Sequence, residues 1–505
     1  MEKQAINLDW LKSVTFWKWM DSSSAFHLAT EAAEVVAHCH TYLTQKARSE
    51  GVPIYGVNTG FGALASTQIA QAELSELQRR ILLSHACGVG DPVPVEIVRA
   101  MLLTKALSLS KGHSGIAPAT LQRIIDMLNA EISPVVPSQG SLGASGDLAP
   151  LAHLVLPLIG EGEVICNGRR MSSKQMLEQM NWQPIVLGAK EGLALINGTQ
   201  MMLSYGLLSL RRAWRLANWA DAMAAWSLEA WNGRSEPFSD DIHRIRHAQG
   251  ARRVAQNVRG WLQDSKLQLH PREQVQDPYS FRCVPQVHGA SRDALTHANQ
   301  VLEAELNAVT DNPLIFPSED LILSGGNFHG QPLAMAIEHM GLAVHELASI
   351  SERRTFKLMS GRHGLPPFLT AQPGLNSGLM IPQYTAASLV SQNKQLTTPA
   401  VADTIDSSNG QEDHVSMGAN GALKLWKMLD NAEMVLAIEC LSASTAMELR
   451  GTDGMAPRLH SLQADLRSKV PHSAADIWLS PIMHQVRDWM LSQDLGEWFH
   501  EDPER

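Results

Sequence analysis

Residues 199–231 read TQMMLSYGLLSLRRAWRLANWADAMAAWSLEAW, a helical pattern far longer than the mean helix of roughly 11–12 residues. Its apolar side chains recur at steps of three and four, the spacing of a packed helical seam, at Leu216, Trp219, Met223, Trp226 and Ala230. The pattern stops at Asn232-Gly233. At a rise of 1.5 Å per residue, helices of some 30–40 residues are about 45–60 Å long, so we expect rods that pack side by side.

Two further stretches have the same long helical pattern. They cover residues 332–359, which end at Ser360-Gly361, and residues 411–449, which end at Arg450-Gly451. The three stretches predict a mainly α-helical protein. We expect an N-terminal globular helical domain at 1–195, a central bundle of long helices at 196–451 and short helices at 452–505.

The first 195 residues have a different pattern. Shorter helices are predicted at 24–49, 95–110 and 119–131. Loops rich in glycine and proline separate them, and such loops carry function more often than packing. Residues 162–169 read GEVICNGR and predict a hairpin that turns at Asn167-Gly168, so β-structure is minor.

The composition excludes general nucleic-acid binders and favours an oligomer. The chain has 505 residues with 41 basic and 51 acidic side chains, a formal net charge of −10, whereas nucleic-acid binders normally show a basic excess. Charged residues make up 18% of the chain against a typical share of about 25%, and apolar residues make up 44%. We therefore expect other copies of the chain to cover part of its surface.

Neither a membrane span nor a secretion signal is expected. The most apolar run, residues 148–159, is short, contains His153 and is interrupted by Pro150 and Pro157. The N-terminal residues MEKQA lack a basic region followed by an apolar stretch. The five cysteines are widely spaced without a CxxC pair, which predicts neither disulfides nor a zinc ribbon. These features predict a soluble cytoplasmic protein.

Residues 140–154 read GSLGASGDLAPLAHL, the most unusual stretch of the chain. Four consecutive small residues at 143–146 expose the backbone, and Asp147 with Pro150 then opens an apolar helix. Ala144-Ser145-Gly146 is therefore expected at a helix N-terminus. Unpaired N–H groups and the positive end of the helix dipole favour negative charge there.

Ala-Ser-Gly followed by Asp-Leu-Ala-Pro-Leu resembles the signature of the histidine and phenylalanine ammonia-lyase family. The resemblance implies that the Gly146 amide nitrogen attacks the Ala144 carbonyl and that two waters are lost, one with the Ser145 hydroxyl. The product is 4-methylidene-imidazol-5-one, an electrophilic cofactor made from the chain itself, with no external cofactor and no metal. The resemblance also implies a fumarase/aspartase-like bundle and a homotetramer in which each pocket draws on three subunits.

Five further segments resemble the family, in family order. They read YGVNTGFG at 55–62, EGLALINGTQ at 191–200, QDPYSFRC at 276–283 with PQVHG at 285–289, SGGNFHG at 324–330 and QEDHVSM at 411–417. Asn197, Phe328 and Glu412 each fall where a loop enters one of the long helices, and Ser145 precedes a fourth helix. If these helix ends meet, one pocket receives several positive dipole ends.

The resemblance gives most of these residues a role. Tyr55 is the expected base for the β-proton, and its reference pKa of about 10 must be lowered by positive charge or hydrogen bonds. Arg282 is expected to bind the substrate carboxylate through two parallel hydrogen bonds. Asn197 and Tyr279 are expected to hydrogen-bond the cofactor carbonyl and the substrate.

Three other residues are expected to support the site. Gln276 and Phe328 shape the pocket, and Asp147 caps the following helix and positions the cofactor loop. Ordinary alternatives exist for the catalytic candidates: a tyrosine that caps its own glycine-rich turn, an arginine in a surface ion pair, and a simple turn at Asn197-Gly198.

Substrate choice depends on Ser84-His85, within LSHACG at 83–88, and on Glu412. Phenylalanine-specific relatives carry Phe-Leu at that pair and tyrosine-specific ones His-Leu, whereas histidine-specific members carry Ser-His. His85 and Glu412 would give each imidazole nitrogen a partner, and an unpaired nitrogen costs roughly 1–3 kcal/mol. L-Histidine is the expected substrate and trans-urocanate the product, a step of histidine catabolism. Residues 404–410, TIDSSNG, replace the more usual Ser-Ile-Pro-Thr-Ser-Ala-Asn, which loosens the loop that carries Glu412.

Other functions stay open at this point. Within the family, the alternatives are a phenylalanine or tyrosine lyase and a 2,3-aminomutase that returns ammonia to the β-carbon. A serine hydrolase with Ser145 as nucleophile fits less well, because residues 143–147 lack the second glycine of G-x-S-x-G and follow no clear strand. A catalytically silent scaffold would not need the whole set of site residues.

Overall fold

The computed structural model describes residues 3–22, 24–48, 53–60, 62–64, 66–272, 274–493 and 495. They fall into two compact units, each assembled from three separate stretches of chain. The first unit contains Met1–Leu208, Asn299–Glu338 and Pro399–Leu423, and the second contains Ser209–Ala298, His339–Thr398 and Lys424–Arg505. The predicted division at residues 195 and 451 follows sequence order instead and stays a prediction. The end of its last segment, 496–505, lies outside the described residues.

The first unit combines helices with small sheets. Its elements are β1 (Lys3–Ile6), α1 (Ser13–Asp21), β2 (Ala25–Leu28), α2 (Thr30–Arg48), α3 (Leu74–His85), β3 (Val89–Pro92), α4 (Val95–Ser110), α5 (Pro118–Asn129), β4 (Ser133–Pro134), β5 (Pro137–Gln139), α6 (Leu148–Val155), β6 (Glu163–Cys166), β7 (Arg169–Ser172), α7 (Ser173–Met180), α8 (Glu191–Ile196), β8 (Leu314–Phe316) and β9 (Leu321–Leu323). Residues 100–110 of α4 are all buried, so this helix lies in the core of the unit.

The strands of this unit pair locally. β1 pairs with β2 in parallel, β3 with β5 and β8 with β9 antiparallel, and β4, β6 and β7 form one antiparallel sheet. The β6–β7 hairpin turns at Asn167 and Gly168 as predicted, with φ angles of 51° and 72°. Positive φ at both central residues is what a tight two-residue hairpin turn requires.

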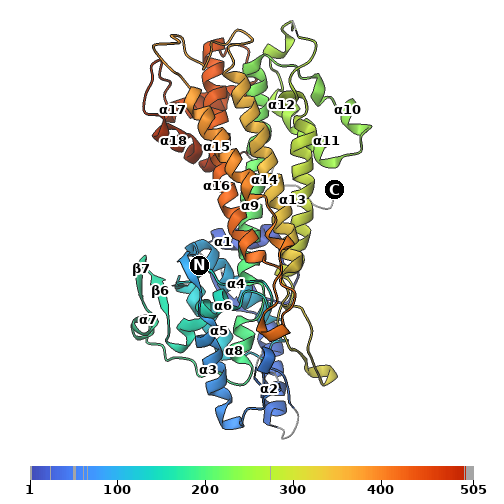
Figure 1. Cartoon of the computed structure of the whole chain (residues 1–505), viewed down its shortest axis with the longest axis vertical. Helices are drawn as coiled ribbons and strands as arrows, with labels where there is room; N and C mark the ends of the chain where they lie inside the picture. Colours follow the sequence, from blue (N-terminus) through green and yellow to red (C-terminus); the bar gives the residue numbers. More distant parts are fainter. Residues whose placement is uncertain are drawn as a thin grey trace. The chain divides into compact units, whose positions relative to one another are not determined.

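Four long helices contribute residues to both units. They are α9 (Gln200–Trp231), α13 (Val284–Leu306), α14 (Gln331–Leu358) and α16 (Gly418–Arg450). In the second unit they run side by side with shorter helices around them (Figure 1). The shorter helices are α10 (Asp240–Arg244), α11 (Gln249–Trp261), α12 (Tyr279–Arg282), α15 (Met380–Leu396), α17 (Pro457–Lys469) and α18 (Leu479–Ser492). No helix among the described residues is long and apolar enough to cross a membrane.

Two predicted helix starts are wrong. The helix predicted at 24–49 begins only at Thr30, because Ala25–Leu28 pair with β1 and the Phe26 backbone bonds the Asn129 side chain. The helix predicted at 411–449 begins at Gly418. The residue just before it cannot extend the helix. Met417 has a φ of 51° and donates its N–H to the carbonyl of Leu142 at 2.8 Å.

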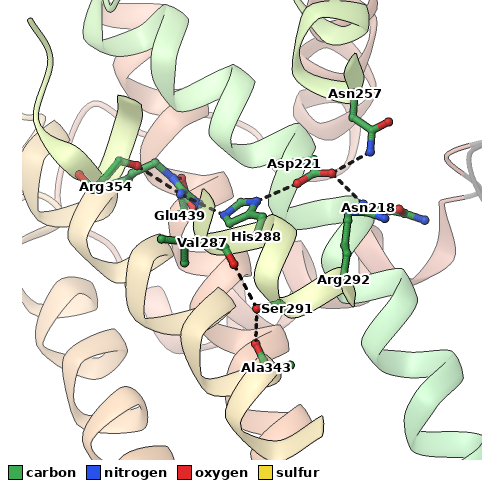
Figure 2. Close-up of polar contacts among 11 residues, drawn as sticks. Asn218, Asp221, Asn257, Val287, His288, Ser291, Arg292, Ala343, Arg354 and Glu439 are labelled. Atoms are coloured by element: carbon green, nitrogen blue, oxygen red, sulfur yellow. Dashed lines mark hydrogen bonds and ion pairs between the residues drawn. The ribbon is translucent and has the colours of Figure 1, made fainter. Parts of the chain in front are cut away.

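A buried network of charged side chains connects the helices of the second unit (Figure 2). Asp221 on α9 accepts hydrogen bonds from His288 Nδ1 at 2.7 Å and from Arg292 at 2.7 Å, both on α13. Asn257 on α11 donates to the same carboxylate at 2.8 Å. Burial lowers the pKa of His288, although the Asp221 carboxylate opposes the shift. The ring is therefore neutral and carries its proton on Nδ1.

A second carboxylate, Glu439 on α16, completes the network. Arg354 on α14 donates to it through Nε at 2.5 Å and Nη2 at 2.8 Å, and both side chains are fully buried. Ser227 and Ser351 each donate a hydroxyl to Glu439 at 2.6 Å. Arg354 Nη1 also lies 3.5 Å from His288 Nε2, so the two carboxylate centres form one network.

Candidate active site

The Ala144-Ser145-Gly146 segment lies in a tight backbone crossing. Gly146 pairs with Gly198, and the Asp147 N–H donates to the carbonyl of Gly198 at 2.7 Å. Gly146 has a φ of 77°, and a Cβ there would lie 2.0 Å from that carbonyl oxygen. Only glycine fits this position. Ala144 and Gly146 are buried, whereas Ser145 is partly exposed.

Four helix N-termini meet at this loop, as predicted. α6 follows it directly, and Met202 in the first turn of α9 donates its N–H to Asp147 Oδ2 at 2.9 Å. Just before α14, the Gly330 N–H donates to the carbonyl of Gly143 at 3.3 Å. Just before α16, the Met417 N–H donates to Leu142. The loop thus lies at several positive dipole ends, an environment that favours developing negative charge.

Asp147 has a different role from the predicted cap of α6. It is the N-cap residue of α6, but its side chain makes no cap bond there. It accepts hydrogen bonds from Met202 of α9 and from the Ser141 hydroxyl at 2.9 Å instead. Burial raises the pKa of this carboxyl to about 6. Asp147 therefore ties the cofactor loop to the start of α9.

Glu412 faces the serine of the motif. The Ser145 hydroxyl donates to Glu412 Oε1 at 2.9 Å, and the Ser407 hydroxyl lies 3.3 Å from Glu412 Oε2. Ser407 and Glu412 also form an antiparallel backbone bridge. Glu412 thus lies in a short loop ahead of α16 and not at the helix start, because residues 415–417 are bonded to the cofactor loop.

Tyr55 lies in a loop beside the one that carries Glu412. Its hydroxyl oxygen accepts the N–H of Gly62 at 3.2 Å, so it does bridge its own glycine-rich loop. Gly62–Leu64 contacts Ser408–Gly410, two residues away from Glu412 along the chain. Phe61 of the same segment lies outside the described residues.

Ser84 and His85 are the end of α3. His85 Nδ1 lies 2.9 Å from the carbonyl of Ile81, so this nitrogen carries the proton and Nε2 can accept one. Burial lowers the pKa of His85, against the opposing effects of the Ile81 bond and the charge of Glu412. His85 is therefore within electrostatic reach of Glu412. Ser84 is exposed.

Asn197 ends α8 beside the loop and is 4% exposed. Its side-chain Oδ1 is buried and has no hydrogen-bond partner among the described residues. Its main-chain oxygen accepts a hydrogen bond from Lys105 Nζ at 2.7 Å. A buried polar atom without a partner costs about 1–3 kcal/mol, so this carboxamide is suited to a group that is added later.

The remaining predicted residues lie apart from this cluster in sequence and contacts. Phe328 is half-buried in the loop before α14, in the first unit. Gln276, Tyr279 and Arg282 belong to the second unit. Tyr279 is 69% exposed, and the Arg282 guanidinium lies 4.5 Å from its ring centre. Gln276 lines a cavity of about 640 Å³ in that unit.

The first unit contains most of the predicted site residues, of which Ser145 and Glu412 are in direct contact: Tyr55, Ser84, His85, Ala144, Ser145, Gly146, Asn197, Phe328 and Glu412. Sequence reasoning missed Lys105 and Ser141. Lys105 has a signal in the sequence, since it is the one charged residue in the helical stretch 100–109. Among the described residues, no group of three or more histidine, cysteine or acidic side chains is arranged to hold a metal ion.

The residues also fit the proposed ring. The glycine at 146 allows the backbone to fold back, Ser145 has a hydroxyl that can leave, and the unpartnered Asn197 carboxamide lies next to the loop. N–H groups at the starts of α9, α14 and α16 donate to the loop that contains the motif.

Comparisons with known proteins identify the family of this chain. The aromatic amino acid lyase family model matches residues 11–468. A histidine ammonia-lyase from Symbiobacterium thermophilum is 48% identical over 470 residues, which are 93% of this chain and 92% of the relative. The crystal structure of histidine ammonia-lyase from Trypanosoma cruzi has a TM-score of 0.90 at 36% identity and covers 97% of this chain and 94% of its own. The phenylalanine aminomutase of Pantoea agglomerans has a TM-score of 0.93 at 31% identity, over 98% of this chain and 99% of its own. This chain therefore belongs to the aromatic amino acid lyase family.

Proposed function

We propose that this chain eliminates ammonia from L-histidine to give trans-urocanate. As a member of the aromatic amino acid lyase family, the chain is a carbon–nitrogen lyase. The observation that favours histidine is the position of Glu412, 2.9 Å from Ser145 and within electrostatic reach of His85. These two polar groups suit the two nitrogens of an imidazole, and relatives at 48% identity are histidine ammonia-lyases.

The cofactor in this proposal is 4-methylidene-imidazol-5-one, formed from Ala144, Ser145 and Gly146. The ring supplies an electrophile for the substrate amine, which makes the nitrogen a better leaving group. Asn197 would donate its carboxamide N–H to the ring carbonyl, since this residue follows α8 directly and is buried beside the loop. The helix ends at 142–147 stabilise negative charge that moves into the loop.

The chain's own side chains move the proton and hold the substrate. Tyr55 takes the β-proton on its side-chain oxygen, which the Gly62 N–H contacts at 3.2 Å. His85 Nε2 accepts the imidazole N–H, and Glu412 binds the other side of the ring. Arg282 binds the carboxylate with help from Tyr279. The substrate pocket is also lined by Gln276, Ser84 and Phe328.

We further propose a homotetramer whose pockets combine residues from different subunits, in the cytoplasm and without nucleic acid. The chain contains few charges, 18%, and α14 exposes large apolar side chains. Met335, Leu342 and Phe356 are 61%, 48% and 48% exposed. Such side chains are suited to burial against other copies of the chain.

Intersubunit complementation tests the shared pocket. Ser145→Ala removes a first-unit residue and Arg282→Ala a second-unit residue, so each variant alone is inactive. Co-expression of both variants should restore part of the activity if one pocket combines Ser145 of one copy with Arg282 of another. Absence of any restored activity in mixed oligomers would contradict the proposed arrangement.

The substrate is tested by incubation with L-histidine, L-phenylalanine and L-tyrosine. We expect the absorbance of urocanate to rise with L-histidine alone, and no β-amino acid by mass spectrometry. Cinnamate or coumarate would indicate a phenylalanine or tyrosine lyase, and a β-amino acid would indicate an aminomutase. The peptide that contains Ser145 should be lighter by two waters, which also separates the lyase from a serine hydrolase.

A further inference from the structure

Lys105 is a buried cation that no part of the proposed reaction uses. It lies in α4, where residues 100–110 are all buried, and is 1% exposed. Of the residues the structure describes, no carboxylate lies within ion-pair distance of it. The closest acidic groups have other partners: Asp311 pairs with Lys190 at 2.5 Å, and Asp147 bonds Ser141 and Met202. A buried ammonium without an ion pair is costly, so its position needs a reason.

The Lys105 ammonium is directed at the peptide that holds the cofactor loop. Its Nζ donates to the main-chain oxygen of Asn197 at 2.7 Å. A hydrogen bond from a charged donor is roughly twice as strong as a neutral one. It therefore fixes the orientation of the peptide between Asn197 and Gly198, at a position where Gly198 has a φ of 131°.

The carbonyl of the next residue, Gly198, contacts the Ala144-Ser145-Gly146 motif and the residue after it. Gly198 O accepts the N–H of Asp147 at 2.7 Å, and Gly146 pairs with Gly198. The order of contacts is thus Lys105, the 197–198 peptide, and Gly146-Asp147. Asn197 also holds the unpartnered carboxamide beside the loop. Lys105 thus bonds the backbone of the residue that precedes Gly198, which in turn pairs with Gly146.

We propose that Lys105 is a positioning residue for formation of the cofactor, which it promotes by holding the 197–198 peptide against Gly146 and Asp147. The inference rests on the proposed function. Ring closure forms a bond from Gly146 N to Ala144 C. The carbonyl oxygen of Ala144 leaves as water with the amide hydrogens of Ser145 and Gly146. The Cα hydrogen and the hydroxyl of Ser145 leave as the second water, so no oxidant or reductant is needed.

Burial lowers the pKa of Lys105 to about 7, with the charge of Asp311 opposing the shift. The amine keeps N–H donors on either side of that value, so the contact to Asn197 persists in both protonation states. Lys105 can therefore hold the 197–198 peptide in place whether or not its amine is fully protonated.

The test is the rate of ring closure in Lys105→Met, Lys105→Gln and the unaltered chain. Each full-length protein is expressed in a pulse and digested at intervals, and the fraction of Ser145 peptide that has lost two waters is measured. Lys105→Met should close at least about tenfold more slowly, because the charged hydrogen bond is lost. Lys105→Gln should be intermediate, since it keeps an N–H donor on a shorter side chain.

Thr104→Val is the matched control. Thr104 is buried on the same helix, and its hydroxyl bonds the carbonyl of Ala100 at 2.9 Å in its own helix. This variant should close at the normal rate. Thermal unfolding of each variant reports its fold separately from its ring closure.

Normal ring closure in a folded Lys105→Met overturns the inference. If Lys105→Met does not fold, a folded Lys105→Gln with normal closure overturns it equally. Failure of the proposed function is distinguishable, because the unaltered chain itself would then keep its Ser145 peptide at the uncyclised mass.

Discussion

Each unit of the molecule has a buried polar cluster, and the two clusters differ in the pairing of their central groups. The second-unit cluster is not fully paired, since Asn257 Oδ1 at its edge has no partner among the described residues. In the second unit, both oxygens of Asp221 and Glu439 accept hydrogen bonds, and both ring nitrogens of His288 have partners (Figure 2). Around the cofactor loop of the first unit, Asn197 Oδ1 has no partner among the described residues, and Ser145 is partly exposed.

The difference suggests different roles: the carboxylates of the second unit stabilise the structure, whereas the amide in the first unit is suited to take part in chemistry. A buried carboxylate whose partners are all present contributes to a stable, specific bundle, and it offers no free lone pair to a ligand. An unpartnered amide next to several helix N-termini costs free energy in the empty site and regains it when a ligand or a new ring arrives. Four substitutions test this contrast, from the largest expected effect to the smallest.

Ser145→Ala should have the largest effect, on activity alone. Turnover of L-histidine should fall by at least about 10⁴-fold, equivalent to about 5.5 kcal/mol of activation free energy, because no electrophile forms. The melting temperature should stay close to that of the unaltered chain. Ser138→Ala in β5 is the control and should keep full turnover. Substantial turnover by Ser145→Ala would contradict the proposed chemistry.

Glu439→Ala should act on stability instead. It leaves Arg354 as a buried charge without its carboxylate, so the free energy of unfolding should fall by about 3–5 kcal/mol in denaturant titrations. Ser227→Ala removes only one neutral donor and should cost about 1 kcal/mol. In both variants that fold, the Ser145 peptide should still lose two waters. Equal stability losses in the two variants would mean that the ion pair is not the main contribution.

His85→Leu should change substrate preference without unfolding the chain. Loss of the acceptor for an imidazole N–H should lower kcat/KM for L-histidine by about 10- to 100-fold, or roughly 1–3 kcal/mol. Arg80, whose side chain is exposed on the same helix, provides the control, since Arg80→Ala should change kcat/KM by less than about threefold. An unchanged kcat/KM in His85→Leu would remove His85 from the proposed imidazole site.

His288→Gln should have the smallest effect, on the pH dependence of stability. The pKa of His288 is below its ordinary value of 6.5 because of burial, so the unfolded chain binds this proton more readily than the folded chain. The contribution of His288 to the free energy of unfolding is therefore fully present above about pH 6.5. It decreases as the pH falls, by at most about 1.4 kcal/mol per pH unit. The difference in unfolding free energy between pH 7 and pH 6 should shrink in His288→Gln. An identical difference in both proteins would show that His288 does not titrate on unfolding.

Much of the fold follows from periodicity in the sequence. The first two long helices were predicted at 199–231 and 332–359 and are observed at Gln200–Trp231 and Gln331–Leu358. α13 was not predicted among the long helices, because its buried face carries His288, Ser291 and Arg292, which pair with side chains of neighbouring helices and interrupt the apolar stripe. A pattern of apolar residues cannot show a buried face that is polar.

Motifs in the sequence predict which residues belong to the candidate site. They do not predict which groups those residues contact in the folded chain. The sequence predicted a site with Ser145, Asn197 and Glu412, and in the structure Ser145 contacts Glu412 and helix ends meet at the loop. It placed the Asp147 side chain on the wrong helix, because a carboxylate at an N-cap position normally bonds its own helix. The Lys105 contact to Asn197 joins residues that are distant in sequence, which no local pattern reveals.

The loop that carries Glu412 also has a consequence for how substrate preference can differ between related enzymes. Ser407 and Glu412 close a small exposed hairpin whose tip, at Asn409, has a φ of 53°. Its only described side-chain contact to the reacting motif is the bond from Glu412 to Ser145. In the proposed site, a new sequence in this segment would change the group that faces the substrate ring, while the backbone at 143–147, fixed by glycines and helix ends, would stay the same.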